Sequence, residues 1–117
     1  MTLEGKVKKG LGNASFWVEK IDKVFFQKKG MNLFYGTLNI ELDNPYELQN
    51  YWIIRKEEYG GTQDVYVQEI TVFNKKAYIV RAENTAHSSK IIELVSNVNL
   101  RDKFNLKDNN IIYISIN

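Results

Sequence analysis

Residues 63–80 read QDVYVQEITVFNKKAYIV, and this stretch predicts a β-hairpin. Its first eleven residues are rich in β-branched and aromatic side chains, which favour strands. Gly60 and Gly61 supply a turn before it, and residues 74–76 interrupt the apolar pattern until it resumes at Ala77. Two neighbouring strands joined by a short turn are therefore expected in the middle of the chain.

Alternating patterns extend on both sides of this hairpin. Residues 38–42 carry apolar side chains at every second position, which is typical of a half-buried strand. Further strands are expected at residues 91–95 and 111–116, and a first strand pair is expected over residues 3–8 and 15–19. Strands of this number and spacing predict a mainly β fold, a small closed barrel.

Helix-forming sequence is scarce. Asp22 can cap a short helix over residues 23–29 that ends at Gly30. Asn99 can cap a second helix over residues 100–104. We therefore expect one or two short helices beside the barrel.

Composition excludes several kinds of site. The 117 residues are enough for a single domain, residues 1–117, that buries a core without cross-links. With no cysteine and His87 as the one histidine, the chain has no disulfide, iron–sulfur cluster, cysteine zinc site, thiol nucleophile or histidine metal cluster. Residues 1–6 do not resemble a signal peptide, and the apolar cluster at residues 51–54 is too short to span a bilayer. A cytoplasmic protein without a membrane partner is expected.

The net charge of +2 is unevenly distributed. Residues 1–30 hold seven lysines against three acids, residues 31–74 two cations against seven acids, and residues 75–117 seven cations against four acids. If the two basic ends meet in the fold, they form a patch suited to a phosphate-bearing ligand. The alternative is that these lysines only form solvated faces.

Residues 10–15 read GLGNAS and lie between two expected strands. Glycines allow backbone N–H groups to approach a phosphate closely. The segment is not a P-loop, because the GK[ST] ending is missing, and it is not a dinucleotide-binding fingerprint, because no helix is expected after it. A phosphate-binding loop and an ordinary glycine hairpin turn both remain compatible with it.

Three further segments carry candidate chemistry. Thr37 and Asn39 project to the same face of a strand, where a hydroxyl and an amide oxygen suit Mg²⁺; the alternative is a polar strand face. Glu93 lies among apolar residues, where a carboxylate needs a partner or a ligand, whereas His87 lacks a visible carboxylate to orient it. Residues 98–101 open the second helix. A helix N-terminus followed by Arg101 suits binding of a phosphate or of a base edge; the alternative is a surface helix capped by Asn99 with a solvated arginine.

The order of these segments resembles the archaeal CTP-dependent riboflavin kinase family. The resemblance covers nearly the whole chain, and its most specific parts are GTLN at residues 36–39 and LRDKFNLKD at residues 100–108. The supporting segments are GKV at 5–7, GLG at 10–12, TAH at 85–87 and IIE at 91–93. The family implies a six-stranded cradle-loop (RIFT-type) β-barrel that transfers the γ-phosphate of CTP to the 5′-hydroxyl of riboflavin, giving FMN and CDP.

The resemblance also implies roles for individual residues. Thr37 and Asn39 are the implied ligands of the cofactor Mg²⁺. Thr85 and Glu93 are the implied flavin-binding residues, and Glu93 either orients the ribityl chain or acts as a catalytic base. The implied nucleotide-binding residues are Leu11, Gly12, Asn13, Ala14, Ser15, Phe16, Val98, Asn99, Leu100 and Arg101.

The sequence departs from the family pattern at three places. Ala14 replaces the last glycine of the loop, which is costly if that position needs a positive φ. Glu83 and Asn84 stand where a proline is common, and Asn109 occupies a turn position that is usually glycine, where asparagine tolerates the left-handed conformation.

Two other functions stay open at this stage. One is a barrel that binds flavin or nucleotide without catalysis. The other is a swapped-hairpin-like DNA-binding protein, which would be a dimer. The kinase interpretation is favoured, with a monomer and no nucleic-acid partner expected.

Overall fold

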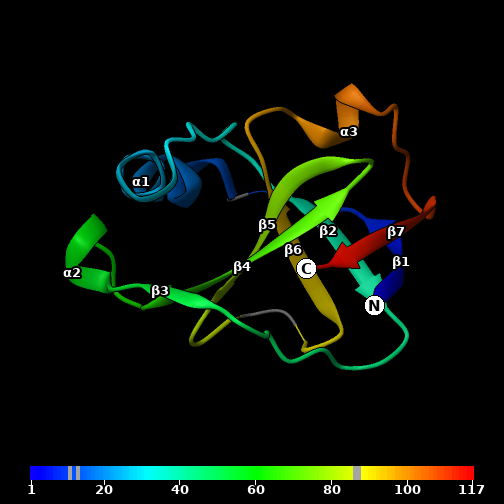
Figure 1. Cartoon of the computed structure of the whole chain (residues 1–117), viewed down its shortest axis with the longest axis horizontal. Coiled ribbons are helices and arrows are strands. Elements are labelled where there is room, and N and C mark those ends of the chain that lie inside the picture. The colour runs from blue at the N-terminus through cyan, green and yellow to red at the C-terminus, as the bar shows by residue number, and fades with distance from the viewer. Residues whose placement is uncertain (11, 13, 86–87) are drawn as a thin grey trace.

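The computed structural model describes residues 1–10, 12, 14–85 and 88–117, and the chain is mainly β (Figure 1). Six antiparallel strands follow one another in the order β4-β5-β6-β2-β1-β7, and β7 pairs with β4 to close the barrel. This closed six-stranded barrel confirms the expected fold class. The barrel strands are β1 Thr2–Lys8, β2 Leu38–Leu42, β4 Val65–Val72, β5 Lys75–Ala82, β6 Ile91–Val95 and β7 Ile111–Ile116.

The central hairpin is formed by β4 and β5, as the sequence predicts. Its turn residues Phe73 and Asn74 have φ values of 51° and 59°. Positive φ at both central residues is the geometry of the tight turns that match the twist of a hairpin. The turn therefore begins one residue before the segment 74–76 where it is expected.

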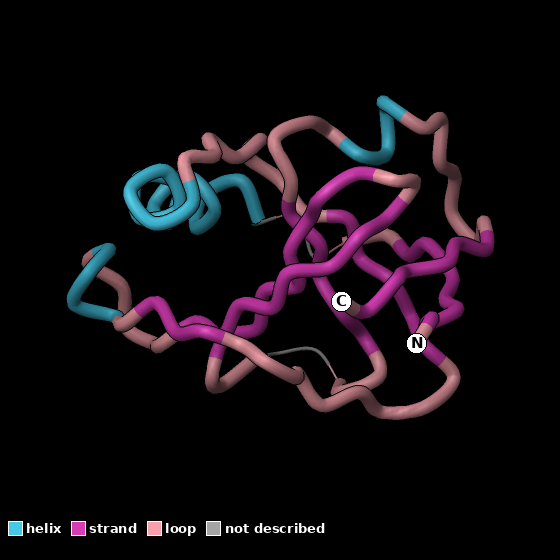
Figure 2. Tube along the Cα trace, viewed as in Figure 1, coloured by secondary structure: helices cyan, strands magenta, loops and turns pink. Residues whose placement is uncertain are grey.

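A short strand, β3 (Trp52–Ile54), extends the sheet beyond the barrel. Strand β5 pairs with one edge of β4 along its whole length. On the other edge of β4, β3 pairs with residues 65–67 and β7 pairs with residues 70–72. A single helical turn, α2 (Lys56–Tyr59), follows β3. Figure 2 shows β3 and α2 extending to one side of the barrel. Elements this short have no periodic pattern, so the sequence does not predict them.

The main correction concerns helix α1 (Ala14–Lys29). A strand at residues 15–19 is wrong, and so is the pairing of that segment with β1. The buried residues Val18, Ile21, Val24 and Phe25 have the spacing of one apolar helix face. Aromatic and β-branched residues at 16–18 favour a strand locally, but burial of this face against the barrel outweighs local propensity.

The ends of the helices are only partly as expected. Asp22 lies inside α1 and is not a cap, whereas Gly30 ends the helix with a φ of 68° and an N–H that donates to the Phe26 carbonyl at 2.8 Å. Helix α3 (Leu100–Lys103) is confirmed with its cap, because the Asn99 side chain accepts from the Asp102 N–H. The described chain thus has three helices, more than expected, and one of them is long.

Two apolar cores lie on opposite faces of the sheet. One face points into the barrel, where Ile40, Ile92 and Ile79 are fully buried. The other face of β4, β5 and β6 is covered by α1, with Phe25 against Tyr78 and Trp52 at ring-centroid distances of 5.0 and 5.4 Å. The site described below lies where this helix-covered face reaches β2.

The first and last strands of the chain meet, because β1 pairs with β7 from Thr2 to Lys6, although β7 itself carries no charged residue. The Arg101 guanidinium adds a link by donating to the Lys8 carbonyl at 3.3 Å. Asn109 adopts a φ of 71°, which confirms the left-handed turn expected there. No helix in the described parts of the chain has the length and apolar character needed to cross a membrane.

Candidate functional site

A row of directly paired residues crosses the sheet from β3 to β1. Trp52 pairs with Val67, Val67 with Val80, Val80 with Glu93, Glu93 with Asn39, and Asn39 with Lys8. Directly paired residues of antiparallel strands project to the same face. The apolar members lie beneath α1, so Glu93 and Asn39 continue the helix-covered face with polar groups.

The Thr37 and Asn39 side chains form a polar pair at the beginning of β2. The Thr37 hydroxyl donates to the Asn39 Oδ1 at 2.9 Å, and Asn39 is 3% exposed. Gly10 lies over this pair, since a Cβ on Gly10 would stand 3.2 Å from the Asn39 amide nitrogen. A side chain at Gly10 would therefore require the buried Asn39 amide to shift by a few tenths of an ångström.

The two oxygens of this pair fit adjacent ligand positions of Mg²⁺. Octahedral Mg²⁺ with oxygen ligands at 2.0–2.1 Å separates neighbouring ligand oxygens by about 2.9 Å. Thr37 and Asn39 have this separation and are both neutral. No group of three histidine, cysteine, aspartate or glutamate side chains in the described residues is arranged to hold a metal. Mg²⁺ commonly takes one or two protein oxygens and fills its remaining positions with water and phosphate oxygens, and a neutral pair of this kind suits that mode of binding.

A cleft of about 460 Å³ opens between α1 and the segment that follows α2. The floor includes Glu93 on β6 and Thr85 in the loop after β5, two residues from separate predicted segments that the fold brings together. The α1 wall consists of Phe16, Trp17 and Lys20, and the opposite wall consists of Tyr59, Gly60, Gly61, Thr62 and Gln63. Aromatic walls and a polar floor suit a planar ring with hydroxyl groups.

Sequence patterns miss most of these wall residues. Trp17 and Lys20 follow from the helical period once α1 is known to be a helix. Tyr59 and Gln63 have no signal beyond the turn at Gly60 and Gly61, because their position depends on how β3 and α2 fold back on the sheet.

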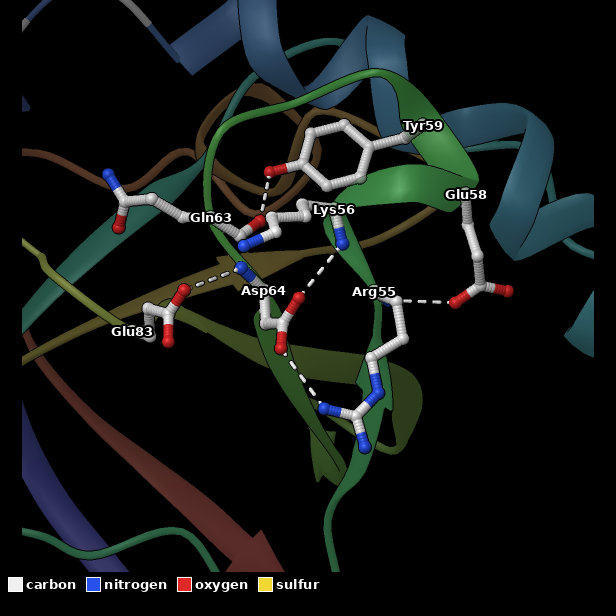
Figure 3. A network of polar contacts seen from close by, with 7 residues as sticks. All are labelled: Arg55, Lys56, Glu58, Tyr59, Gln63, Asp64 and Glu83. Atoms are coloured by element: carbon white, nitrogen blue, oxygen red, sulfur yellow. Dashed lines mark hydrogen bonds and ion pairs between the residues drawn. The ribbon is translucent and has the colours of Figure 1, made fainter.

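Hydrogen bonds hold the Tyr59 wall in place (Figure 3). The Tyr59 hydroxyl donates to the Gln63 carbonyl, and the ring lies against Gly61, where no side chain has room. The Gln63 Oε1 accepts from the Asn84 N–H at 2.8 Å. This bond ties the wall to the residue immediately before Thr85. Burial of the ring raises the pKa of the Tyr59 hydroxyl, so it stays a proton donor at neutral pH.

Asp64 anchors the base of the same wall. Its carboxylate accepts from the Lys56 N–H at 2.9 Å and from the Arg55 guanidinium at 3.0 Å, and its own N–H donates to the Glu83 carboxylate at 3.2 Å (Figure 3). The Lys56 N–H contributes most to lowering the pKa of Asp64 from its ordinary value of 3.8. The anion is therefore favoured by the fold.

This lowered pKa makes part of the stability depend on pH. A carboxyl group with a depressed folded-state pKa stabilises the fold above its unfolded-state pKa, and this stability is lost as the pH falls through the folded-state value. We expect Asp64→Asn to be less stable than the native chain at pH 7, with a gap that narrows below pH 3.8. Urea unfolding of both proteins at pH 7 and pH 3 measures it. A gap of equal size at both values contradicts the assignment.

Residues 98–101 lie beside the Thr37–Asn39 pair. A narrow crevice of about 20 Å³ is bordered by these four residues together with Phe34, Gly36 and Thr37. Arg101 pairs with Asp108 at 3.0 Å, which holds its guanidinium near the end of β1. The predicted nucleotide segment at 98–101 and the predicted metal pair are thus neighbours.

The glycine segment leads into a helix and is not a hairpin turn. Gly12 has a φ of 88°, and Ala14 is the first residue of α1 with no positive φ. Among the described residues of this segment, Gly12 is the left-handed one, and alanine at 14 does not need a positive φ. Phe16 lines the same cleft as Thr85 and Glu93, not the crevice at 98–101. Four of the residues considered in the sequence analysis lie outside the described residues: Leu11, Asn13, Ala86 and His87.

Comparisons with known proteins identify the family of this chain. The family model CTP-dep_RFKase, described as a domain of unknown function (DUF120), matches residues 7–116. A riboflavin kinase of Methanococcus vannielii is 33% identical over 129 residues, covering 97% of this chain and 96% of the relative. Riboflavin kinases of Staphylothermus marinus and Methanococcus maripaludis are each 31% identical, covering 97% and 99% of this chain and 90% and 100% of theirs. The family expected from the motifs is confirmed: the chain belongs to the CTP-dependent riboflavin kinase family, a family of phosphotransferases.

Proposed function

We propose that this protein transfers the γ-phosphate of CTP to the 5′-hydroxyl of riboflavin with the help of Mg²⁺, giving FMN and CDP. The observation that carries the proposal is the direct pairing of Asn39 with Glu93. This pairing places Thr37 and Asn39, which suit a cation bound to phosphate, beside Glu93 on the floor of the 460 Å³ cleft, which suits a planar ring. The two substrates of a phosphoryl transfer must meet in this way.

Riboflavin occupies the 460 Å³ cleft in this proposal. The isoalloxazine ring lies between the aromatic wall of α1 and Tyr59, and the ribityl chain runs along Thr85 and Glu93 toward Asn39. Aromatic side chains favour stacked or edge-on contacts with such a ring. Gln63 accepts hydrogen bonds from the Tyr59 hydroxyl and from the Asn84 N–H, and these bonds tie the Tyr59 wall to the floor beside Thr85.

The nucleotide lies on the other side of Asn39. Residues 98–101 border it, and backbone N–H groups at the beginning of α1 face its phosphates, where the helix dipole favours negative charge. Thr37 and Asn39 hold Mg²⁺ through their side-chain oxygens. The bound cation supplies charge neutralisation for the phosphate oxygens.

The transfer itself forms a bond between the riboflavin 5′-oxygen and the γ-phosphorus, breaks the bond from that phosphorus to the bridging oxygen, which leaves on CDP, and releases the proton of the 5′-hydroxyl to solvent. Such reactions depend mainly on alignment and electrostatics, with little need for a strong base. We therefore assign Glu93 the role of accepting a hydrogen bond from the 5′-hydroxyl and aligning it. If Glu93 acts as the base instead, Glu93→Gln changes the pH dependence of kcat as well as its size.

A direct assay tests the proposed function. The protein is incubated with riboflavin, Mg²⁺ and either CTP or ATP, and FMN is separated and measured by its fluorescence. Formation of FMN with CTP supports the proposal. Absence of FMN with every nucleotide overturns it, and tight FMN binding without turnover then identifies a non-catalytic flavin-binding barrel. A preference for ATP retains the reaction and overturns the choice of nucleotide.

The role of the cleft wall gives a separate prediction. We expect Tyr59→Ala to raise the KM for riboflavin by about fivefold with little change in kcat, because an aromatic contact is worth about 1 kcal/mol and binds substrate and transition state alike. Tyr59→Phe keeps the ring and serves as the matched control. Steady-state kinetics at varied riboflavin concentration measure the effect. An unchanged KM in Tyr59→Ala would show that the Tyr59 ring does not contact bound riboflavin.

A further inference from the structure

Asp22 holds the segment that leads into the Thr37–Asn39 pair. Its Oδ1 accepts from the Leu33 N–H at 2.6 Å, and its Oδ2 accepts from the Tyr35 hydroxyl at 3.2 Å. Both contacts span more than ten residues of sequence, so they are tertiary and not part of a local turn. Hydrogen bonds to a carboxylate are shorter and stronger than those between neutral groups.

The same segment is held from its other side by the barrel. The Phe34 N–H donates to the Ser96 carbonyl at 2.9 Å, directly after β6. The Phe34 ring packs on Gly36, where a Cβ would stand 2.9 Å from a ring carbon. Residues 33–36 are therefore fastened to α1 through Asp22 and to the sheet through Ser96, and Thr37 follows immediately.

Helix α1 also contacts the flavin cleft. Its first turns contribute Phe16, Trp17 and Lys20 to the cleft wall, and Asp22 lies two residues further along the same helix. Backbone hydrogen bonds join each turn of an α-helix to the next, so the residues at its beginning and in its middle keep fixed relative positions. One helix thus borders the riboflavin cleft at its beginning and holds the entry to the metal pair from its middle.

We propose that Asp22 is a positioning residue that sets the Thr37 hydroxyl against Asn39 and so determines the affinity for the metal–nucleotide complex. This inference rests on the proposed function. Asp22 touches neither substrate, and it acts through Leu33 and Tyr35. Without its two bonds, the segment before Thr37 loses its hydrogen bonds to α1 and keeps the Ser96 contact and the packing of the Leu33 side chain, so the hydroxyl is held less firmly beside the Asn39 oxygen.

The test compares variants of the full chain. Asp22→Ala removes both acceptor oxygens, Asp22→Asn keeps one acceptor for the Leu33 N–H, and Tyr35→Phe removes only the hydroxyl bond. Glu19→Ala is the matched control, because Glu19 is an exposed carboxylate one turn earlier on the same helix. For each protein, Mg²⁺-dependent binding of CDP is measured by calorimetry, riboflavin binding by fluorescence quenching, and FMN formation by kinetics.

We expect Asp22→Ala to raise the half-saturating Mg²⁺ concentration and the CDP Kd by about tenfold, the size expected for a hydrogen bond to a charged group. The riboflavin affinity of Asp22→Ala stays unchanged, and Asp22→Asn recovers most of the lost affinity for Mg²⁺ and CDP. Tyr35→Phe has a smaller effect on these two constants, and Glu19→Ala has none. If Asp22 only stabilises the fold, its replacement lowers the fraction of folded, active protein but does not change the Mg²⁺ and CDP constants of the protein that remains folded. If Asp22→Ala does not fold, Asp22→Asn and Tyr35→Phe decide the question by the same measurements.

Two failures are distinguishable. Unchanged Mg²⁺ and CDP constants in the Asp22 and Tyr35 variants, with normal FMN formation by the native chain, overturn the positioning role alone. If the native chain forms no FMN but binds CDP with Mg²⁺, the proposed function is overturned and the calorimetry still tests Asp22. If the native chain binds no CDP with Mg²⁺, both proposals are overturned.

Discussion

Asn39→Ala is expected to lower kcat/KM for the nucleotide by about a hundredfold or more and to raise the Mg²⁺ concentration needed for activity. Loss of residues that merely orient metal ligands typically costs 10- to 100-fold, so the loss of a direct ligand lies at or above the upper end of this range. The substitution also removes the acceptor of the Thr37 hydroxyl. Kinetics at varied Mg²⁺ concentration measure both effects.

Because Asn39 is buried, a loss of stability must be separated from a loss of metal binding. Gln68 is equally buried, at 3% exposed, and bonds to Tyr46 inside the barrel, away from the site. Gln68→Ala is therefore expected to destabilise the protein without changing its Mg²⁺ requirement. Asn39→Asp retains a ligand oxygen and is expected to recover part of the metal dependence. Equal Mg²⁺ requirements in Asn39→Ala and the native protein would remove Asn39 from the metal pair.

The second large effect is on stability. Phe25→Ala is expected to lower the free energy of unfolding by about 3–5 kcal/mol, the usual cost of deleting a buried aromatic ring. Phe25 is fully buried between Tyr78 and Trp52, where it fastens α1 to the sheet. Urea unfolding of the native protein and the variant measures the difference.

The neighbouring residue provides the control for this prediction. Phe26 follows on the same helix but is 53% exposed, so Phe26→Ala is expected to stay within about 0.5 kcal/mol of the native protein. Similar losses for the two variants would show that the effect comes from helix propensity and not from burial against the sheet.

Sequence patterns recover the barrel better than the helices. The alternation in β2 and the hairpin of β4 and β5 is strong enough to predict strands, because one face of each is buried in the barrel. The failure at α1 has a definite cause. Its apolar face spans residues 18–25, but the aromatic residues just before it imitate a strand, and Asp22 inside it imitates a cap.

The candidate site is predicted in parts. Thr37, Asn39, Thr85, Glu93 and residues 98–101 are singled out by residue type and by their order along the chain. Their neighbourhood is a property of strand register, which pairs Asn39 with Glu93. The cleft walls at Trp17, Tyr59 and Gln63, and the contacts of Asp22, escape prediction because each depends on segments that are distant in sequence.

The sequence by itself determines the segments that form the six barrel strands, the family, and local features such as the Asn99 cap and the left-handed Asn109. Each of these follows from a few neighbouring residues, through side-chain alternation, short-range hydrogen bonds or allowed φ. Only the tertiary structure decides that residues 14–29 form one helix, that Asn39 lies beside Glu93, and that Asp22 reaches Leu33 and Tyr35. The reason is that burial and strand register depend on the whole sheet, and local propensity yields where a long apolar face finds a surface to cover.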